Sequence, residues 1–165
     1  MTLQFTARKA FAALIVAFIF HNLEEAISIC KYPVQSLVSF IEPATCRQYI
    51  VAVTIITTVV LFAFGYAIRT KKPAAYLLIS TAIASGLVLN VLVPHFFVAL
   101  YTLNYTPGLI TAVALNLPLG LLTLYKNRSN YKNRKQFYKH IGIGLCVGYL
   151  IFAVVMMLTT IIIDK

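Results

Sequence analysis

The chain has 165 residues, of which 61% are hydrophobic and only 11% are charged, and its mean hydropathy is +0.87. This composition excludes an ordinary soluble globular domain and indicates an integral membrane protein. The formal net charge is +10. Because the basic residues lie between apolar runs, the charge predicts a membrane topology with lipid contacts, and no nucleic-acid partner is expected.

Five apolar runs are long enough to cross a hydrocarbon core, which takes about 20 residues at a rise of about 1.5 Å per residue. The sequence therefore predicts an all-α fold, a polytopic membrane helix bundle with five transmembrane helices. Nearly all of the chain lies in these runs, so we expect a single membrane domain over residues 1–165. The predicted spans are Ala10–Ser28, Tyr49–Ile68, Ala74–Tyr101, Pro107–Tyr125 and Ile141–Ile163.

The first span can be interpreted in two ways. Arg8 and Lys9 precede an apolar stretch, as in a secretory signal, and Ala26 and Ser28 are candidate cleavage residues. Two glutamates directly before the cut disfavour a signal. The length of the apolar run favours an uncleaved transmembrane helix instead.

Within this span the motif "HNLEE" places His21, Glu24 and Glu25 in a membrane helix. At about 100° per residue, Glu25 lies about 40° from His21 and Glu24 about 60° to the other side, so the three side chains share one face. A carboxylate near mid-helix costs up to about 2.5–3.5 kcal/mol. Protons, polar partners or a metal must therefore neutralise the two glutamates.

Two of the three cysteines fall between the first and second spans. Cys30 and Cys46 can form a disulfide if that side of the membrane is oxidising, or can remain free thiols, and the sequence leaves both alternatives open. Cys146 lies in the fifth span, where we expect a small apolar residue.

The third span carries Asn90 and His95 near the end that should lie at the depth of the HNLEE face. Pro94 cannot donate to the carbonyl of Asn90, so the helix is predicted to be interrupted there. Asn90 and His95 could line a polar site. They could equally be the interhelical hydrogen bonds that often hold membrane helices together.

The fourth span begins with "YTPGLIT", in which Thr106 is predicted to cap the helix and Pro107 to occupy its first turn. The free N–H groups of that end would point at the same polar layer. Small residues then recur at every fourth position, which favours close helix packing. The stripe in the fourth span is Gly108, Ala112, Asn116 and Gly120.

In the fifth span, Gly144 and Gly148 could serve an internal contact or a homodimer equally well.

The distribution of basic residues predicts the orientation. Eleven of the 14 Lys and Arg residues share one side of the predicted bundle, and Lys31, Arg47 and Lys165 lie on the other. Cytoplasmic segments retain positive charge, so the N-terminus should be cytoplasmic and the C-terminus outside. The most basic segment, residues 125–140, is predicted to be a cytoplasmic loop.

Three motifs together, "HNLEE", the Asn90 and His95 pair, and "YTPGLIT", resemble the family of bacterial membrane proteins named for their HXXEE motif. The resemblance covers most of the first four spans. It implies location in a bacterial cell membrane and a common site at the motif residues. The family is a domain of unknown function, so the resemblance implies no reaction.

Two imidazoles and one carboxylate form a His₂Glu set with an open position for water, the pattern of hydrolytic zinc sites. His21, Glu25 and His95 are therefore predicted to bind a divalent metal, with zinc as the first candidate. The spacing H-x-x-E-E resembles the H-x-x-E-H arrangement of inverted zinc peptidases. In those peptidases the glutamate three residues after the first histidine is the general base. That similarity assigns the base to Glu24. The residues expected to orient substrate or stabilise an oxyanion are Asn90, Tyr105 and Thr111.

From these residues we expect a metal-dependent hydrolase or transferase that acts on a lipid-like or membrane-embedded substrate near the outer face. Its partners would be membrane lipid and an apolar small molecule. One alternative is a metal-free acid/base isomerase, similar to five-helix sterol isomerases in architecture only. Another is a structural cluster in which one glutamate is protonated and the other pairs with Lys31 or Arg47. A transporter or an immunity-type protein is the third, although the other spans carry no acid at mid-depth for a proton relay.

Overall fold

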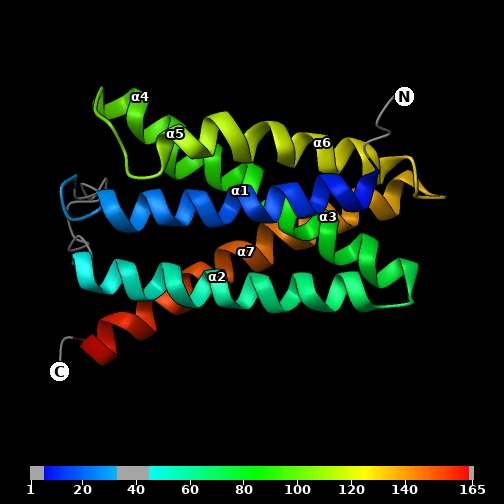
Figure 1. Cartoon of the computed structure of the whole chain (residues 1–165), viewed down its shortest axis with the longest axis horizontal. Coiled ribbons are helices and arrows are strands. Elements are labelled where there is room, and N and C mark those ends of the chain that lie inside the picture. The colour runs from blue at the N-terminus through cyan, green and yellow to red at the C-terminus, as the bar shows by residue number, and fades with distance from the viewer. Residues whose placement is uncertain (1–5, 33–44, 164–165) are drawn as a thin grey trace.

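The computed structural model describes residues 6–32 and 45–163, and these form a bundle of helices (Figure 1). Five continuous helical stretches are long and apolar enough to cross a membrane, which confirms the predicted all-α architecture. The elements are α1 (Ala7–Ser28), α2 (Cys46–Arg69), α3 (Pro73–Asn90), the π-helix η1 (Val91–Phe97), α4 (Val98–Thr102), α5 (Leu109–Thr111), the π-helix η2 (Ala112–Asn116), α6 (Leu117–Arg128) and α7 (Arg134–Ile163).

Helix starts follow local signals. Thr6 caps α1 by accepting a hydrogen bond from the backbone N–H of Lys9 at 3.3 Å. Thr45 begins α2 with a capping box in which Gln48 is the return partner. Pro73 occupies the first turn of α3, where its missing N–H leaves no hydrogen bond unmade.

Helix α1 is the centre of the bundle. In Figure 1 it runs between α6 and α2, with α3 behind it and α7 crossing obliquely below. In the most apolar 18-residue stretch of α1, half of the residues are buried inside the bundle, against 11% in that of α7. Helix α7 is therefore the span most accessible to lipid. The core is apolar and forms around one face of α1. Its buried members are Phe11, Leu14, Ile15, Phe18, Ala67, Tyr76, Ala84 and Leu87.

The basic segment predicted as a loop is mostly helical, which corrects that prediction. Helix α6 continues to Arg128 and α7 already begins at Arg134, so only residues 129–133 connect them. Lys and Arg are good helix formers, and their long side chains can reach water from a terminal turn. An apolar run therefore underestimates the length of a membrane helix with basic ends.

The third and fourth spans are each interrupted by a π-helical segment, η1 and η2 respectively. Pro94 lies inside η1, so the interruption predicted at this proline is present. The fourth span begins at Leu109, after Gly108 in a left-handed conformation (φ 80°), and not at Pro107 as predicted. A single π-turn shifts the side chains that follow it around the helix axis and is frequent at functional sites.

Glycines allow α3, α6 and α7 to approach closely. A Cβ atom on Gly144 would collide with the carbonyl oxygen of Ala82, and one on Gly120 would lie 2.7 Å from Cγ2 of Val88. Gly144 and the fourth-span stripe therefore serve internal packing. A homodimer through Gly144 and Gly148 stays a prediction.

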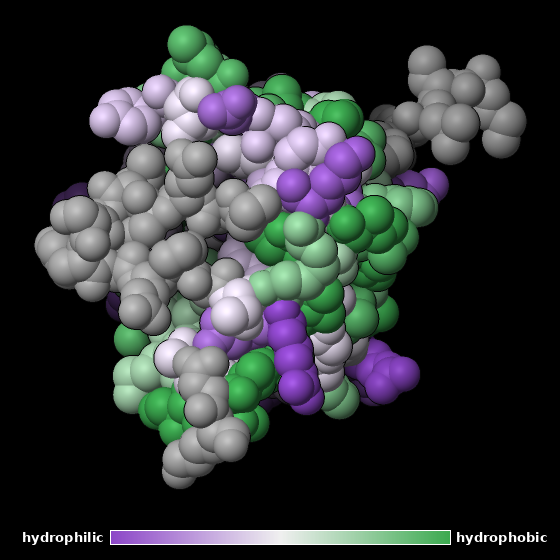
Figure 2. Space-filling view, turned by 90° about the vertical axis from the view of Figure 1, so that its left-hand side faces the viewer, coloured by the Kyte–Doolittle hydropathy of each residue, from purple (hydrophilic) through white to green (hydrophobic). Residues whose placement is uncertain are grey.

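The two ends of the bundle differ in chemistry. The end where α1 finishes, here called the site end, carries a disulfide between Cys30 and Cys46, with Cα atoms 5.1 Å apart. Figure 2 looks onto this end and shows hydrophilic surface between hydrophobic flanks. The opposite end, here called the basic end, holds the eleven basic residues counted above, whereas Lys165 lies outside the described residues.

Candidate metal centre

The HNLEE motif forms the last two turns of α1 at the site end. His21 is fully buried, Glu25 is 5% exposed, and Glu24 is partly buried. The three side chains face two interrupted helices, η1 with α4 and α5 with η2. The motif thus meets the parts of the bundle where the backbone departs from regular α-helix.

Three potential metal ligands converge here from α1 and η1. Nε2 of His95 lies 3.3 Å and Nε2 of His21 3.6 Å from Oε1 of Glu25. One ligand atom from each residue lies within 4.8 Å of the other two, and the two imidazole rings are almost perpendicular at 88°. Ligands about 2.1 Å from a tetrahedral zinc lie about 3.4 Å apart. The spacing fits a divalent metal bound by two nitrogens and one oxygen.

The second nitrogen of His21 has its own partners. Nδ1 lies 3.1 Å from the carbonyl oxygen of Gly108 and 3.3 Å from Oγ1 of Thr111. A carbonyl oxygen can only accept, so Nδ1 carries the proton and donates it. Nε2 then presents a lone pair towards Glu25 and His95, as a metal-binding histidine requires.

Glu24 is held by the start of the fourth span. Its carboxylate accepts hydrogen bonds from the Tyr105 hydroxyl, the backbone N–H of Ile110 at 3.3 Å, and the backbone N–H of Thr111 at 2.8 Å. The Thr111 hydroxyl donates the fourth bond at 2.5 Å. A carboxylate at a helix N-terminus also interacts favourably with the helix dipole.

The predicted cap of the fourth span is therefore wrong. The residue before the first turn is Gly108, not Thr106, and the Thr106 hydroxyl instead donates to the carbonyl oxygen of His95 at 3.2 Å. Glu24 takes the capping role from a different helix. A local signal identifies side chains able to cap, but a carboxylate placed by tertiary packing is a stronger acceptor than a hydroxyl.

Thr111 connects Glu24 with the candidate metal ligand His21. Its single hydroxyl proton is donated to Glu24 at the shortest of its contacts, so its oxygen can accept from Nδ1 of His21. The result is a chain from the Glu24 carboxylate through Thr111 to His21. Such outer partners fix the tautomer and orientation of a metal-binding imidazole.

Asn90 lies beside both imidazoles. Its amide nitrogen is 3.2 Å from Nε2 of His95 and 3.5 Å from Nε2 of His21. Rotating the amide by 180° exchanges the nitrogen and the oxygen. In one orientation Asn90 donates to the imidazoles, and in the other its oxygen could serve as a fourth ligand to a metal.

The connection between α4 and α5 closes the site. A Cβ atom on Gly108 would lie 2.6 Å from both Cε1 of His21 and Cγ of Glu25, so glycine is required for space as well as for its positive φ. Tyr105, in the same connection, contacts Tyr32 edge to face, with ring centroids 5.1 Å apart. Burial and the hydrogen bond to Glu24 raise the pKa of the Tyr105 hydroxyl.

The structure brings all seven predicted site residues into one cluster. Two further groups in the cluster were not predicted from the sequence. Tyr49 of α2 donates to Oε1 of Glu25 at 3.5 Å, and the Gly108 carbonyl accepts from His21. Tyr49 is the first residue of the predicted second span, and only the packing of α2 against α1 shows that it faces Glu25.

A cavity of about 300 Å³ adjoins the cluster between α2, α3, η1 and α7. Glu25, Asn90 and Tyr49 lie on its wall, and most of the other lining side chains are apolar. The candidate metal centre is therefore connected to a space that suits a hydrocarbon chain.

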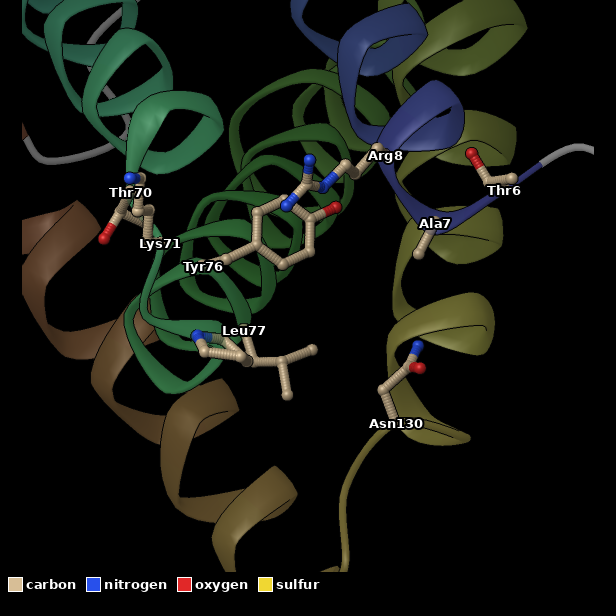
Figure 3. A pocket seen from close by; sticks show the side chains of 9 residues that line it. Thr6, Ala7, Arg8, Thr70, Lys71, Tyr76, Leu77 and Asn130 are labelled. Carbon is tan, nitrogen blue, oxygen red and sulfur yellow. The ribbon is translucent and has the colours of Figure 1, made fainter.

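A second cavity, of about 520 Å³, lies at the basic end, and Figure 3 shows the side chains that line it. The guanidinium of Arg8 lies over the Tyr76 ring there, 5.6 Å from its centroid. Neither histidine nor carboxylate is among the described residues that line this cavity. Of the two cavities, the one lined by Glu25 is therefore the one that adjoins the candidate metal ligands.

Comparison with known proteins identifies a family and a curated relative. A family described as "Protein of unknown function with HXXEE motif" matches residues 12–123, which contain every residue of the cluster. The chain is also 31% identical over 143 residues to "Uncharacterized protein YrkK" of Bacillus subtilis (strain 168), covering 86% of this chain and 88% of that protein. No solved structure matches the chain.

Proposed function

Because this chain belongs to the family of proteins with the HXXEE motif, whose function is unknown, we propose its activity from the site itself: a metal-dependent intramembrane hydrolase or transferase. Its substrate is a lipid-like or membrane-embedded molecule. One observation carries the proposal. Nδ1 of His21 is committed as a donor to Gly108, so its Nε2 lone pair faces Glu25 and His95 at metal-ligand spacing.

His21, Glu25 and His95 would hold the metal, with zinc as the first candidate. When bound, such a metal polarises a substrate oxygen or a water molecule. Glu24 and Thr111 orient His21, and Asn90 lies where it can contact the substrate or the metal. Tyr105 is a further donor at the rim of the site. The role of Glu24 as general base remains part of the proposal.

The proposed membrane is a bacterial cell membrane, as the relative from Bacillus subtilis supports. We place the site end outside, since the basic end carries the charge that cytoplasmic segments retain, and a disulfide persists in an oxidising compartment. A reporter inserted near Asn130 should then be cytoplasmic, and one fused after Lys165 outside. The opposite pair of results would reverse the orientation.

The metal is tested on the protein purified in detergent without chelator. Wild type should contain about one metal ion per chain, because the three ligands form one site. His21→Ala removes a ligand and should empty the site. Glu24→Gln removes no ligand and should retain metal. Wild-type protein that binds no zinc, iron or manganese, even after incubation with each, would refute the metal-dependent activity.

The orientation of Asn90 favours one alternative, a metal-free acid/base isomerase. With its amide nitrogen towards both imidazoles, Asn90 satisfies their lone pairs, and Glu25 can share a proton with them. This alternative predicts no metal in wild type, and folded His21→Ala and Glu24→Gln variants that have lost activity on an apolar substrate. A purely structural cluster predicts that His21→Ala is less stable, because a buried polar partner is left unsatisfied.

A further inference from the structure

The cavity beside the metal centre has a polar end and an apolar body. Its polar end is formed by Asn22, Glu25, Tyr49 and Asn90. The body is lined by aliphatic and aromatic side chains of α2, α3 and α7. Among the described lining residues, Glu25 is the one with a formal charge, and none is Lys or Arg.

The body opens sideways between α2 and α7. Val59 of α2, Tyr149 of α7 and Phe152 of α7 line it and are 42%, 44% and 40% exposed. These residues lie within spans apolar enough for the membrane, so their exposed surface meets lipid. Molecules in the bilayer can therefore enter without crossing water.

Glycine keeps the cavity open. Gly148 of α7 lies opposite Gly86 of α3, where a Cβ atom on Gly148 would be 3.8 Å from Cα of Gly86. Both glycines line the cavity. A Cβ atom at Gly148 therefore has room beside α3, and a large side chain there would occupy the part of the cavity next to Gly86.

We propose that this cavity binds the hydrocarbon chain of an uncharged, single-chain amphiphile, a long-chain alcohol or its ester, with the oxygen-bearing group at Glu25 and Asn90. A volume of about 300 Å³ is at the small end of ligand sites, which suits one chain and not two. Asn22, Tyr49 and Asn90 offer neutral hydrogen-bonding groups to an uncharged headgroup, and no Lys or Arg among the described lining residues would pair with an anionic one. The ester as substrate rests on the proposed function, whereas chain binding does not.

The experiment uses full-length protein in detergent and a hexadecanol probe with a photoreactive diazirine in its chain. Cross-linked peptides should map to α2 and α7 around Val59 and Phe152, and unlabelled hexadecanol should compete. On protein freed of metal with a chelator, the matching fatty acid, which is ionised at neutral pH, should label about tenfold less, since burying a charged headgroup without a cationic partner is costly. Equal labelling by the acid would overturn the proposal.

Two matched pairs of variants test the location. Gly148→Leu should reduce labelling to background, and Gly142→Leu on the same helix should not, because nothing lies within 4 Å of a Cβ atom at Gly142. Val59→Trp provides a second obstruction, with Leu61→Trp as its control outside the cavity, should Gly148→Leu fold poorly. Unchanged labelling in folded Gly148→Leu or Val59→Trp would overturn the assignment.

The metal content separates the two proposals. His21→Ala should lose metal and still be labelled by hexadecanol, and Gly148→Leu should retain metal and lose labelling. Wild type that is labelled but holds no metal would refute the proposed activity alone. Wild type that holds metal but is not labelled would refute the chain-binding site alone.

Discussion

Two polar clusters are buried in this bundle, one at each end, and both combine histidine, asparagine, tyrosine and threonine. At the site end, imidazole nitrogens face a carboxylate. At the basic end, the corresponding groups face one another and carry no acid. The members of this second group, here called the basic-end cluster, are Ser80, Thr81, Asn127, Tyr131 and His140.

The basic-end cluster joins three elements through neutral hydrogen bonds. The Asn127 amide donates to Ser80 at 2.8 Å and to Thr81 at 3.2 Å. The Tyr131 hydroxyl lies 2.7 Å from Nδ1 of His140 and donates to the Leu77 carbonyl at 2.9 Å. These bonds hold the connection between α6 and α7 against α3, which is the usual function of polar residues between membrane helices.

The two clusters differ in whether they contain a buried carboxylate whose charge must be compensated. In the basic-end cluster, the imidazole pairs with a hydroxyl and nothing charged needs compensation. In the site cluster, two buried imidazoles meet a buried carboxylate, and no Lys or Arg side chain pairs with that carboxylate among the described residues. A cation or a proton is needed there to offset the desolvation.

The largest expected difference is between the two buried histidines His95 and His140. His95→Ala should abolish metal binding, because one of three ligands is lost. His140→Ala should retain the wild-type metal content and lose only the hydrogen bond to Tyr131. Metal analysis of both purified variants measures this difference, and equal metal content in the two would show that the clusters do not differ in function.

The two glycines Gly108 and Gly142 provide the next test. Gly108→Ala places a methyl group against His21 and Glu25 at a positive φ, so the ligand geometry must change. We expect metal affinity to fall by about 10–100-fold, as for the loss of an outer partner. Gly142→Ala, with open space around it, should bind metal like wild type. Competition with a fluorescent chelator gives both affinities.

Two threonine hydroxyls allow a milder comparison. Thr111→Val breaks the link between Glu24 and His21 and should weaken metal binding by about tenfold, the lower limit for an outer partner. Thr81→Val removes contacts with Tyr131 and Asn127 and should leave metal affinity unchanged. The free energy of unfolding should fall by about 0.6 kcal/mol, the average for a hydrogen bond between membrane helices, and by at most about 1.7 kcal/mol. Thr111→Ser should behave like wild type in chelator competition, since the hydroxyl remains.

The smallest expected effect is on alkaline stability. Burial raises the pKa of both Tyr105 and Tyr131, and Tyr105 also donates to a carboxylate. A tyrosine with a raised folded pKa contributes stability below the unfolded value of about 10 and loses it as the pH rises through the folded value. Above that pH, the melting temperatures of Tyr105→Phe and Tyr131→Phe should therefore fall less than the melting temperature of wild type. We expect the larger change for Tyr105→Phe.

Much of this molecule could be predicted locally. Long apolar runs define the five membrane helices, because each must satisfy its backbone inside hydrocarbon. Helical periodicity places His21, Glu24 and Glu25 on one face, and Pro94 marks the irregular turn that carries His95. The candidate ligands were therefore evident from residue type and spacing alone.

Only the tertiary structure decided which groups meet. The sequence contains Thr106 as a local cap, yet Glu24 reaches the helix N-terminus from another span. Tyr49 reaches Glu25, and Gly108 makes room for two ligands. Cys30 pairs with Cys46 because the end of α1 lies beside the start of α2. Periodicity sets the direction of a side chain relative to its own helix. Its partner depends on helix tilt, rotation and depth, which arise from packing contacts distant in sequence.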